Sequence, residues 1–472
     1  MLQQLEELFK NHVGKAPEKV EELSSSGSNR RYFRLSANDF SLVGVIGTNK
    51  DENKAFCKID EHFLAKGINV PRVVAISEDY MTYLQEDLGN DILYKLLENG
   101  RMSGEYSSYE KQMLIKTIEM LPKIQFAGAD GLDFDNCYPQ PAFNRRLVMF
   151  DLNYFKYCFL KASGLDFNEV KLQEDFEKLA DELVKDEGNT FMYRDFQSRN
   201  VMRYDDEPYF IDFQGGMKGP IYYDVASFIW QARSRYPEEL KMELVDKYIK
   251  ALGAYMEVDK DEFMSRLRLF VLFRSMQVLG AYGFRGYFEK KPHFLQSVPF
   301  AMENLRRLLV EPFEEYPYLS ETLKKLANMR QFYDIVKDDR LSVKIYSFSY
   351  KKGIPADNSG NGGGYVFDCR SINNPGKYEH YKKFTGMDPE VIKFFEEDGE
   401  IFEFLDHVYG IVDHHVKRFI ERKFTNMMVS FGCTGGQHRS VYSAEQLGAY
   451  LSKKYDIKVT IIHREQNIEK VL

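Results

Sequence analysis

The sequence predicts an α+β N-terminal part followed by a smaller α/β C-terminal part. Short apolar, strand-like stretches occur within residues 191–214, and long amphipathic helical segments follow at 238–252 and 261–279. Near the C-terminus, a strand of Met and β-branched residues at 427–431 leads through a glycine-rich turn into an amphipathic helix at about 440–454. These patterns predict a helix-rich first part and a second part with a strand-turn-helix unit.

Composition predicts a boundary between the two parts near residues 335–341. The 472 residues are 44% hydrophobic, which suits two or three domains with substantial cores. Residues 340–472 carry 19 Lys and Arg against 17 Asp and Glu, a net charge of +2, although the whole chain carries −8. Most of the histidines and the glycine-rich tract at 359–364 also lie in this second part.

The chain has the composition of a soluble, cytoplasmic protein without a membrane partner. No apolar run approaches the roughly 20 residues of a membrane-spanning helix, and the first residues are too acidic for a signal peptide. Five scattered cysteines lack Cys-x2-Cys spacing, so neither a zinc cluster nor a disulfide framework is predicted.

Asp195, Asn200 and Asp212 are the candidate catalytic and metal-binding residues. Phosphoryl transfer needs a carboxylate that orients a substrate hydroxyl and accepts its proton, and oxygen ligands that hold Mg²⁺ on nucleotide phosphates. Asp195 suits the first role, and Asn200 and Asp212 suit the second. A hairpin between the two flanking strands would bring Asn200 and Asp212 to one sheet edge, although Asp and Asn are also common in ordinary turns.

Several stretches resemble known kinases. Tyr193–Asn200 and Ile211–Gln214 resemble the catalytic segment of the aminoglycoside and choline phosphotransferase superfamily. Gly27–Leu35, Gly219–Ser227 and Gln277–Gly280 resemble, more narrowly, the anomeric kinases of N-acetylmuramate and N-acetylglucosamine. The resemblance covers about the first 330 residues.

This resemblance implies a bilobal, protein-kinase-like domain at 1–335 that uses ATP and Mg²⁺. The small lobe would span about 1–87 and the large lobe about 88–335. The resemblance places Glu86 and Asp87 at the hinge between the lobes, where backbone groups hold adenine.

A loop of small residues is the candidate phosphate-binding loop. It contains Ser26, Gly27 and Ser28, whose backbone N–H groups can approach phosphate, although a flexible linker has the same composition.

Two positions depart from the superfamily pattern. Tyr193 stands where His is usual, and the strand-like stretch 41–47 lacks the Lys that generally holds nucleotide phosphates. Arg31 is therefore included among the nucleotide-binding candidates. The sequence leaves Arg34, Lys54 and Lys58 open as alternatives, and each of these basic residues could equally be a surface charge.

The C-terminal strand, turn and helix predict an anion site. Free N–H groups and the positive end of the helix meet at the turn, together with His438 and Arg439. A phosphate or phosphosugar suits Arg geometry, but an ordinary tight turn would need the same glycines. Cys433 and Arg439 also have the spacing of a cysteine phosphatase loop, yet Gly432 stands where those enzymes usually carry His, and no general acid is identifiable.

The second part, residues 341–472, resembles the C-terminal domain of the RNase adapter protein RapZ, which senses glucosamine 6-phosphate and presents a small RNA. The resembling stretches occur in the same order and are Ser347–Pro355, Phe367–Arg370, Asn374–Pro375, Thr385–Asp388 and Gly432–Tyr442. By this resemblance, the residues that hold an amino-sugar phosphate would be Asp368, Arg370, Thr434, Gly435, Gly436, His438, Arg439 and Ser440. Gln437 stands where the adapter generally has Lys.

Taken together, these features predict an ATP-dependent small-molecule kinase. It would phosphorylate a sugar hydroxyl, the anomeric hydroxyl of an N-acetyl amino sugar in cell-wall salvage, and carry a phosphosugar-sensing domain that regulates it. One alternative is a RapZ-like regulatory protein that binds nucleotide and phosphosugar and has a degenerate kinase half. Another is a kinase for an aminoglycoside or other small alcohol. RNA is a weaker expectation, because the second part is only slightly basic and contains the acidic tract 396–400.

Overall fold

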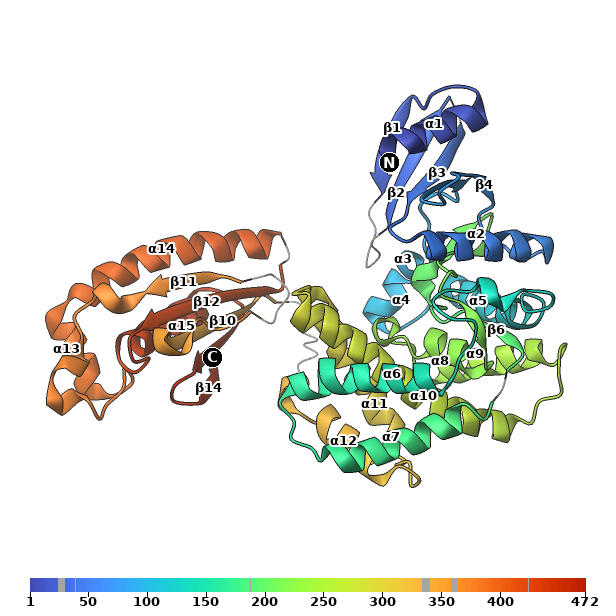
Figure 1. Ribbon diagram of the computed structural model, residues 1–472. Coiled ribbons are helices and arrows are strands. Elements are labelled where there is room, and N and C mark those ends of the chain that lie inside the picture. Colours follow the sequence, from blue (N-terminus) through green and yellow to red (C-terminus); the bar gives the residue numbers. More distant parts are fainter. Residues whose placement is uncertain (24–29, 39, 187, 333–339, 358–362, 423) are drawn as a thin grey trace. The chain divides into compact units, whose positions relative to one another are not determined.

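The chain forms two compact units. The computed structural model describes residues 1–23, 30–38, 40–186, 188–332, 340–357, 363–422 and 424–472. One unit consists of Met1–Ala281 and Val298–Tyr333, and the other of Tyr282–Ser297 and Asp334–Leu472. Figure 1 shows the elements of both units. The boundary expected near 335–341 from composition stays a prediction.

The N-terminal unit begins with a small lobe built on an antiparallel sheet with the strand order β1-β2-β3-β5-β4. Its elements are α1 (Leu2–Val13), β1 (Lys19–Leu23), β2 (Arg31–Ala37), β3 (Phe40–Ile46), α2 (Lys50–Ala65), β4 (Val73–Ile76) and β5 (Thr82–Glu86). Leu5 and Phe9 of α1 are fully buried and pack with Phe33, Leu35 and Leu84 of the sheet. α1 therefore covers one face of this sheet (Figure 1).

Helix α2 joins the small lobe to the large lobe. It begins after the N-cap residue Asn49, whose side-chain oxygen accepts hydrogen bonds from the first turn. The Phe56 ring stacks on Tyr83 of β5 at 5.2 Å and on Phe213 of the large lobe at 4.7 Å. Phe63 meets Phe191 edge-on at 5.0 Å. These apolar ring contacts fix α2 between the lobes.

The large lobe is mostly helical. Its elements are α3 (Leu93–Leu96), α4 (Glu98–Ser103), α5 (Ser108–Phe126), α6 (Arg145–Phe155), α7 (Glu169–Leu183), β6 (Thr190–Met192), β7 (Val201–Tyr204), β8 (Glu207–Phe210), β9 (Met217–Gly219), α8 (Tyr222–Ile229), α9 (Glu238–Leu252), α10 (Lys260–Gly283), α11 (Val298–Leu308) and α12 (Pro317–Ala327). The helices expected at 238–252 and 261–279 are confirmed as α9 and α10. Within the described residues, every helix is too short or too polar to cross a bilayer.

The strands around the catalytic motif pair differently from the expectation. β7 and β8 form the hairpin, whereas β6, which contains Phe191, pairs with β9. The reason is the tight turn at Asp205 and Asp206, which both have positive φ, at 51° and 58°. Two consecutive left-handed residues favour a two-residue hairpin turn, and Asp tolerates that conformation better than most residues.

The C-terminal unit is an α/β domain. Its elements are β10 (Ser342–Ser349), β11 (Tyr365–Asp368), α13 (Pro389–Asp398), α14 (Glu400–Glu421), β12 (Asn426–Cys433), α15 (Arg439–Lys454), β13 (Lys458–His463) and β14 (Ile468–Val471). The sheet order is β11-β12-β10-β13-β14, with the first four strands parallel and β14 antiparallel. The predicted strand, turn and helix are confirmed as β12 and α15.

Strand order places the carboxyl ends of β10 and β12 side by side at one end of this sheet. From β10 the chain passes to β11 on one side, and from β12 it passes to β13 on the other. The connections that leave β10 and β12 therefore run in opposite directions across the sheet, and parallel α/β sheets bind ligands at the carboxyl ends of strands where the direction of the connections reverses. The glycine-rich turn follows β12 directly, at this end of the sheet.

We expect the stability of the N-terminal unit to fall with rising pH because of Asp60. This α2 carboxyl is 1% exposed and accepts a hydrogen bond from the Val73 N–H at 3.0 Å. Burial raises its pKa from 3.8 to about 7, so the folded state binds this proton more tightly than the unfolded state. Between these values, wild type should lose about 1.4 kcal/mol of unfolding free energy per pH unit relative to Asp60→Asn. Urea unfolding of both proteins at pH 5, 6 and 7 measures the difference, and parallel pH profiles would contradict the prediction.

Candidate active site

A cavity of about 320 Å³, here called the interlobe cavity, is lined by residues of both lobes of the N-terminal unit. Its walls come from the small-lobe sheet, α2, the segment after β5 and the β7–β8 hairpin, and include Arg30, Tyr32, Val43, Phe56, Tyr83, Glu86, Asp87, Asn200, Met202, Ile211 and Asp212. Both predicted metal ligands and the two predicted hinge residues therefore line the same cavity.

The β7–β8 hairpin places Asn200 and Asp212 at its open end. The Ile211 N–H donates to the Asn200 carbonyl oxygen at 3.0 Å, which ties the residues before β7 to those after β8. The Asn200 side-chain amide donates to the Asp195 carbonyl oxygen at 2.8 Å. Asn200 therefore connects the loop of Asp195 to Asp212, and its amide oxygen is the atom suited to a metal ion.

The Asp212 carboxylate suits a bound cation. Burial raises its pKa, and the nearby charge of Asp195 raises it further, while a 2.7 Å hydrogen bond from the Gln214 amide opposes these effects. A cation beside such a carboxyl favours its charged form. The described residues contain no cluster of three or more His, Cys, Asp or Glu that could hold a metal by itself. Asn200 and Asp212 fit Mg²⁺, because this ion is commonly bound by one or two protein groups together with substrate phosphates.

Tyr193 is a buried link between the catalytic loop and Asp212. Its hydroxyl donates to the Ile211 carbonyl oxygen at 2.5 Å. Its ring packs edge-on against Phe196 and Phe213, at 5.4 and 6.3 Å. The departure from His at this position is therefore compatible with an ordered site.

Asp224 holds the same loop in place through hydrogen bonds to its backbone. This carboxylate, in the first turn of α8, is fully buried and accepts hydrogen bonds from the N–H groups of Tyr193 at 2.7 Å and Arg194 at 2.8 Å. Arg194 has a φ of 72°, a left-handed conformation that needs such support. The sequence signal is an Asp directly before the apolar run Val225–Trp230, which motif spacing alone does not connect with Asp195.

A second group of charges lies around Asp195. The Arg274 guanidinium of α10 is 3.8 Å from the Asp195 carboxylate, and Arg194 pairs with Asp151 of α6 at 3.3 Å. Arg274 and Asp151 are buried, and burial raises the pKa of Asp151. Sequence reasoning missed this group because its members come from three separate segments. It forms a largely buried charged cluster beside the predicted catalytic carboxylate.

Arg30 is buried and Arg31 is exposed, although they are neighbours in the sequence. Arg31 is exposed, pairs with Glu22 at 2.8 Å and is not among the residues lining the interlobe cavity. Arg30, which motif reasoning did not consider, is 2% exposed and lines that cavity. Neighbouring residues of an extended strand point to opposite faces, which explains the difference.

The other predicted nucleotide-binding residues divide into two groups. Ser26, Gly27 and Ser28 lie outside the described residues. Asp87 lines the cavity, and its carboxylate pairs with Arg34 of β2 at 2.5 Å and accepts a hydrogen bond from Ser41 at 2.7 Å. Arg34 is thus engaged in holding the segment after β5 against the sheet.

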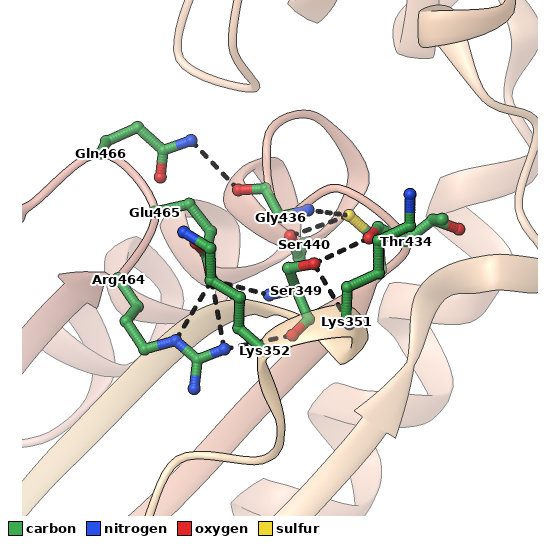
Figure 2. Close-up of polar contacts among 10 residues, drawn as sticks. Ser349, Lys351, Lys352, Thr434, Gly436, Ser440, Arg464, Glu465 and Gln466 are labelled. Atoms are coloured by element: carbon green, nitrogen blue, oxygen red, sulfur yellow. Dashed lines mark hydrogen bonds and ion pairs between the residues drawn. The ribbon is translucent and has the colours of Figure 1, made fainter.

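In the C-terminal unit, the glycine-rich turn is held to the ends of β10 and β12 (Figure 2). The Ser349 hydroxyl donates to the Thr434 carbonyl oxygen at 2.7 Å. The Gly436 N–H donates to the Cys433 sulfur at 3.1 Å, and the Ser440 hydroxyl lies 3.2 Å from the same sulfur. Gly436 has a φ of 68°, so this turn needs glycine there.

Glu465 supports the turn from the end of β13. Its carboxylate is 6% exposed, pairs with Lys352 at 2.6 Å and accepts a hydrogen bond from the Ser349 N–H at 3.2 Å (Figure 2). A Cβ at Gly436 would lie 2.4 Å from the Glu465 Cγ, so the turn and this side chain are closely packed. Lys352 and Arg464 are held by Glu465 beside the turn. The sequence motifs did not identify Glu465, Lys352 and Arg464 as one group.

The predicted phosphosugar residues differ in exposure. Asp368, Arg370, Thr434 and Gly435 are exposed at the carboxyl ends of the strands. Asp368 pairs with Arg370 at 2.7 Å.

Three other predicted phosphosugar residues, His438, Arg439 and Ser440, are buried. The His438 Nε2 lies 3.1 Å from the Tyr381 carbonyl oxygen, and burial lowers the pKa of His438. The Arg439 guanidinium donates to the carbonyl oxygens of Arg370 and Ile372, both at 2.9 Å. This engagement favours a structural role for Arg439 over that of a cysteine phosphatase arginine.

Two protein families match separate parts of the chain. Residues 19–262 match the model of the phosphotransferase enzyme family, and residues 341–467 match that of the RapZ C-terminal domain. A nucleotide-binding protein of Hahella chejuensis is 36% identical over 129 residues, which are 27% of this chain and 43% of that protein. The chain thus spans less than half the length of this curated relative.

Two solved structures are also similar to this chain. A putative aminoglycoside phosphotransferase of Ralstonia eutropha has 12% identity and a TM-score of 0.48, covering 69% of this chain and 98% of that one. A choline kinase of Cryptosporidium parvum has 11% identity and a TM-score of 0.43, covering 65% and 93%. Together with the family match, the two-lobed architecture confirms the predicted protein-kinase-like fold of the N-terminal unit, followed by a separate α/β domain.

We expect Asp224→Ala to destabilise the N-terminal unit. The change leaves two buried backbone N–H groups without their acceptor, which costs about 1–3 kcal/mol for each donor. Urea unfolding measures the loss, with Glu257→Ala, an exposed carboxylate of the same lobe, as the control. An unchanged unfolding midpoint in Asp224→Ala would show that these hydrogen bonds do not hold the loop.

Proposed function

Because the chain belongs to the phosphotransferase enzyme family, we propose that it is an ATP-dependent kinase that phosphorylates a sugar hydroxyl, the anomeric hydroxyl of an N-acetyl amino sugar. The observation that carries this proposal is the convergence of Asp195, Asn200 and Asp212 beside one cavity between the lobes. The choice of an amino sugar rests on residues 27–35 and 219–227, which resemble stretches of the anomeric kinases of N-acetylmuramate and N-acetylglucosamine.

ATP would occupy the interlobe cavity. Val43, Met202 and Ile211 offer apolar surface to a planar base, and Glu86 and Asp87 lie at the segment that joins the lobes. The triphosphate would extend toward the opposite end, marked by Asn200 and Asp212. Mg²⁺ held by these two residues would supply positive charge to the phosphates.

Asp195 would act on the acceptor hydroxyl. Its side chain is exposed, and its loop is held through Asn200, Tyr193 and Asp224, so the carboxylate has a defined position. The carboxylate orients the hydroxyl and accepts its proton while the acceptor oxygen forms a bond to the γ-phosphorus. The bond between the γ-phosphorus and the bridging oxygen breaks, and ADP leaves. Arg194, the partly exposed member of the charged cluster with Asp151 and Arg274, would contact polar groups of the acceptor.

The kinase proposal is tested by ATP turnover with N-acetylmuramate, N-acetylglucosamine, glucosamine, choline and kanamycin. We expect turnover with an N-acetyl amino sugar, and a decrease of about 10²–10⁴-fold in Asp195→Ala, because general-base catalysis contributes rate gains of this size. Asp166→Ala, an exposed carboxylate of the same lobe, is the control and should retain full turnover. Turnover with choline or kanamycin alone would change the acceptor class. ATP binding without turnover of any acceptor would instead favour the regulatory alternative.

The C-terminal unit is proposed to bind an amino-sugar phosphate. The site would lie at the carboxyl ends of β10 and β12, where the exposed residues Thr434 and Gly435 precede α15 and Arg370 lies at the adjacent strand end. The match to the RapZ C-terminal domain supports this ligand class. Bound phosphosugar would regulate the kinase as a product or pathway signal.

We expect Gly436→Ala to weaken glucosamine 6-phosphate binding by about tenfold or more, because the left-handed turn and its contact with Glu465 exclude a Cβ. Calorimetric titration of the full chain measures this loss. Gly410→Ala in α14, where a Cβ meets nothing within 4 Å, is the control. Equal affinity in Gly436→Ala and wild type would contradict the proposed site. Inhibition of turnover by the phosphosugar in wild type, but not in Gly436→Ala, would support regulation.

A further inference from the structure

The N-terminal unit lacks a lysine on the strand where related kinases hold nucleotide phosphates. β3 reads FSLVGVI, and Val43 is its residue lining the interlobe cavity. Among the described residues that line this cavity, the cations are Arg30 and Lys95. Lys95 is exposed on α3, whereas the Arg30 side chain is 2% exposed. Arg30 is therefore the buried positive charge of the cavity.

Arg30 reaches the cavity from the neighbouring strand. It directly precedes β2, whose first residue, Arg31, pairs with Ile46 at the end of β3. Arg30 is therefore adjacent to the end of the strand that lacks the lysine. Its guanidinium also lies 5.8 Å from the centre of the Phe56 ring, another cavity residue.

Glu52 positions the Arg30 guanidinium. One of the guanidinium nitrogens, Nη2, lies 3.2 Å from the Glu52 Oε1, and Glu52 belongs to the first turn of α2. The N-cap Asn49 and the ring contacts of Phe56 hold this end of α2 in place. The guanidinium thus has a defined position on the small-lobe side of the cavity.

The same guanidinium is attracted electrostatically to Asp212 on the large-lobe side. A buried cation costs several kcal/mol in lost hydration unless nearby negative charge compensates it. Glu52 and Asp212 supply part of that compensation. A nucleotide triphosphate would add more, and the planar Arg fork matches phosphate oxygens in a two-point contact.

We infer that Arg30 holds the nucleotide phosphates in this chain, in the place of the strand lysine, and that Glu52 sets its position. The inference rests on the proposed kinase function and deepens it. It assigns one side of the phosphate site to Arg30 and the other to the Mg²⁺ ligands Asn200 and Asp212. Arg30 is a binding and positioning residue for ATP, and Asp195 keeps the role of the base.

The test compares binding of ATP with Mg²⁺ and binding of adenosine to the full chain by calorimetry. Arg30→Met removes the charge and keeps much of the side-chain volume. Arg31→Met is the matched control on the opposite face of the strand. We expect Arg30→Met to weaken ATP binding by about 30-fold, the size of one charge-assisted contact, and to leave adenosine binding within about twofold. Arg31→Met should change neither affinity.

Loss of adenosine and ATP affinity to the same extent in Arg30→Met would mean that Arg30 only shapes the cavity, and would overturn the inference. An ATP affinity equal to wild type would also overturn it. If Arg30→Met does not fold, as judged by its near-ultraviolet circular dichroism, Glu52→Gln decides the question. We expect Glu52→Gln to weaken ATP binding several-fold with adenosine unchanged, and an unchanged ATP affinity overturns the inference. A wild type that binds adenosine and ATP equally, or neither, would instead argue against the proposed kinase function itself.

Discussion

The active-site geometry depends on the hydrogen bonds that the buried Asp224 carboxylate accepts from the N–H groups of Tyr193 and Arg194. These bonds hold Arg194 in a left-handed conformation and so determine where the chain presents Asp195. Asp224 is fully buried, and this burial raises its pKa to about 7. The loop is therefore held in place by groups of the protein interior, while the side chain of Asp195 is exposed.

Tyr193 links this loop to the segment that precedes Asp212. Its hydroxyl bonds the Ile211 carbonyl, one residue before Asp212, and its ring is enclosed by the aromatic core around Phe196 and Phe213. One short segment thus connects α8, the catalytic loop and the end of the hairpin. Tyr193, which stands where His is usual, thus makes a polar link at this point.

The two candidate anion sites are built by different physical means. In the N-terminal unit, the buried Arg30 guanidinium pairs with Glu52 and is attracted electrostatically to Asp212. In the C-terminal unit, the turn after β12 presents backbone N–H groups, and Glu465 fixes the turn by packing against Gly436. The first arrangement depends on two lobes approaching each other, whereas the second is built within one strand-turn-helix unit.

Local patterns determined much of this protein from the sequence alone. The periodicity that predicts α9 persists in the structure because that helix buries one face, whereas α10 is buried on all sides over residues 270–274 and α15 over residues 439–444. The spacing of Asp195, Asn200 and Asp212 places them on one compact loop and hairpin. The tertiary structure alone decided which cation enters the cavity. Arg30 and Arg31 are adjacent and chemically identical, and only the packing of β2 against β3 and α2 determines which of them is buried. The tertiary structure also decided the positions of Arg274, Asp151 and Glu465. Each of them meets its partners through long-range packing, which the spacing of residues along the chain does not predict.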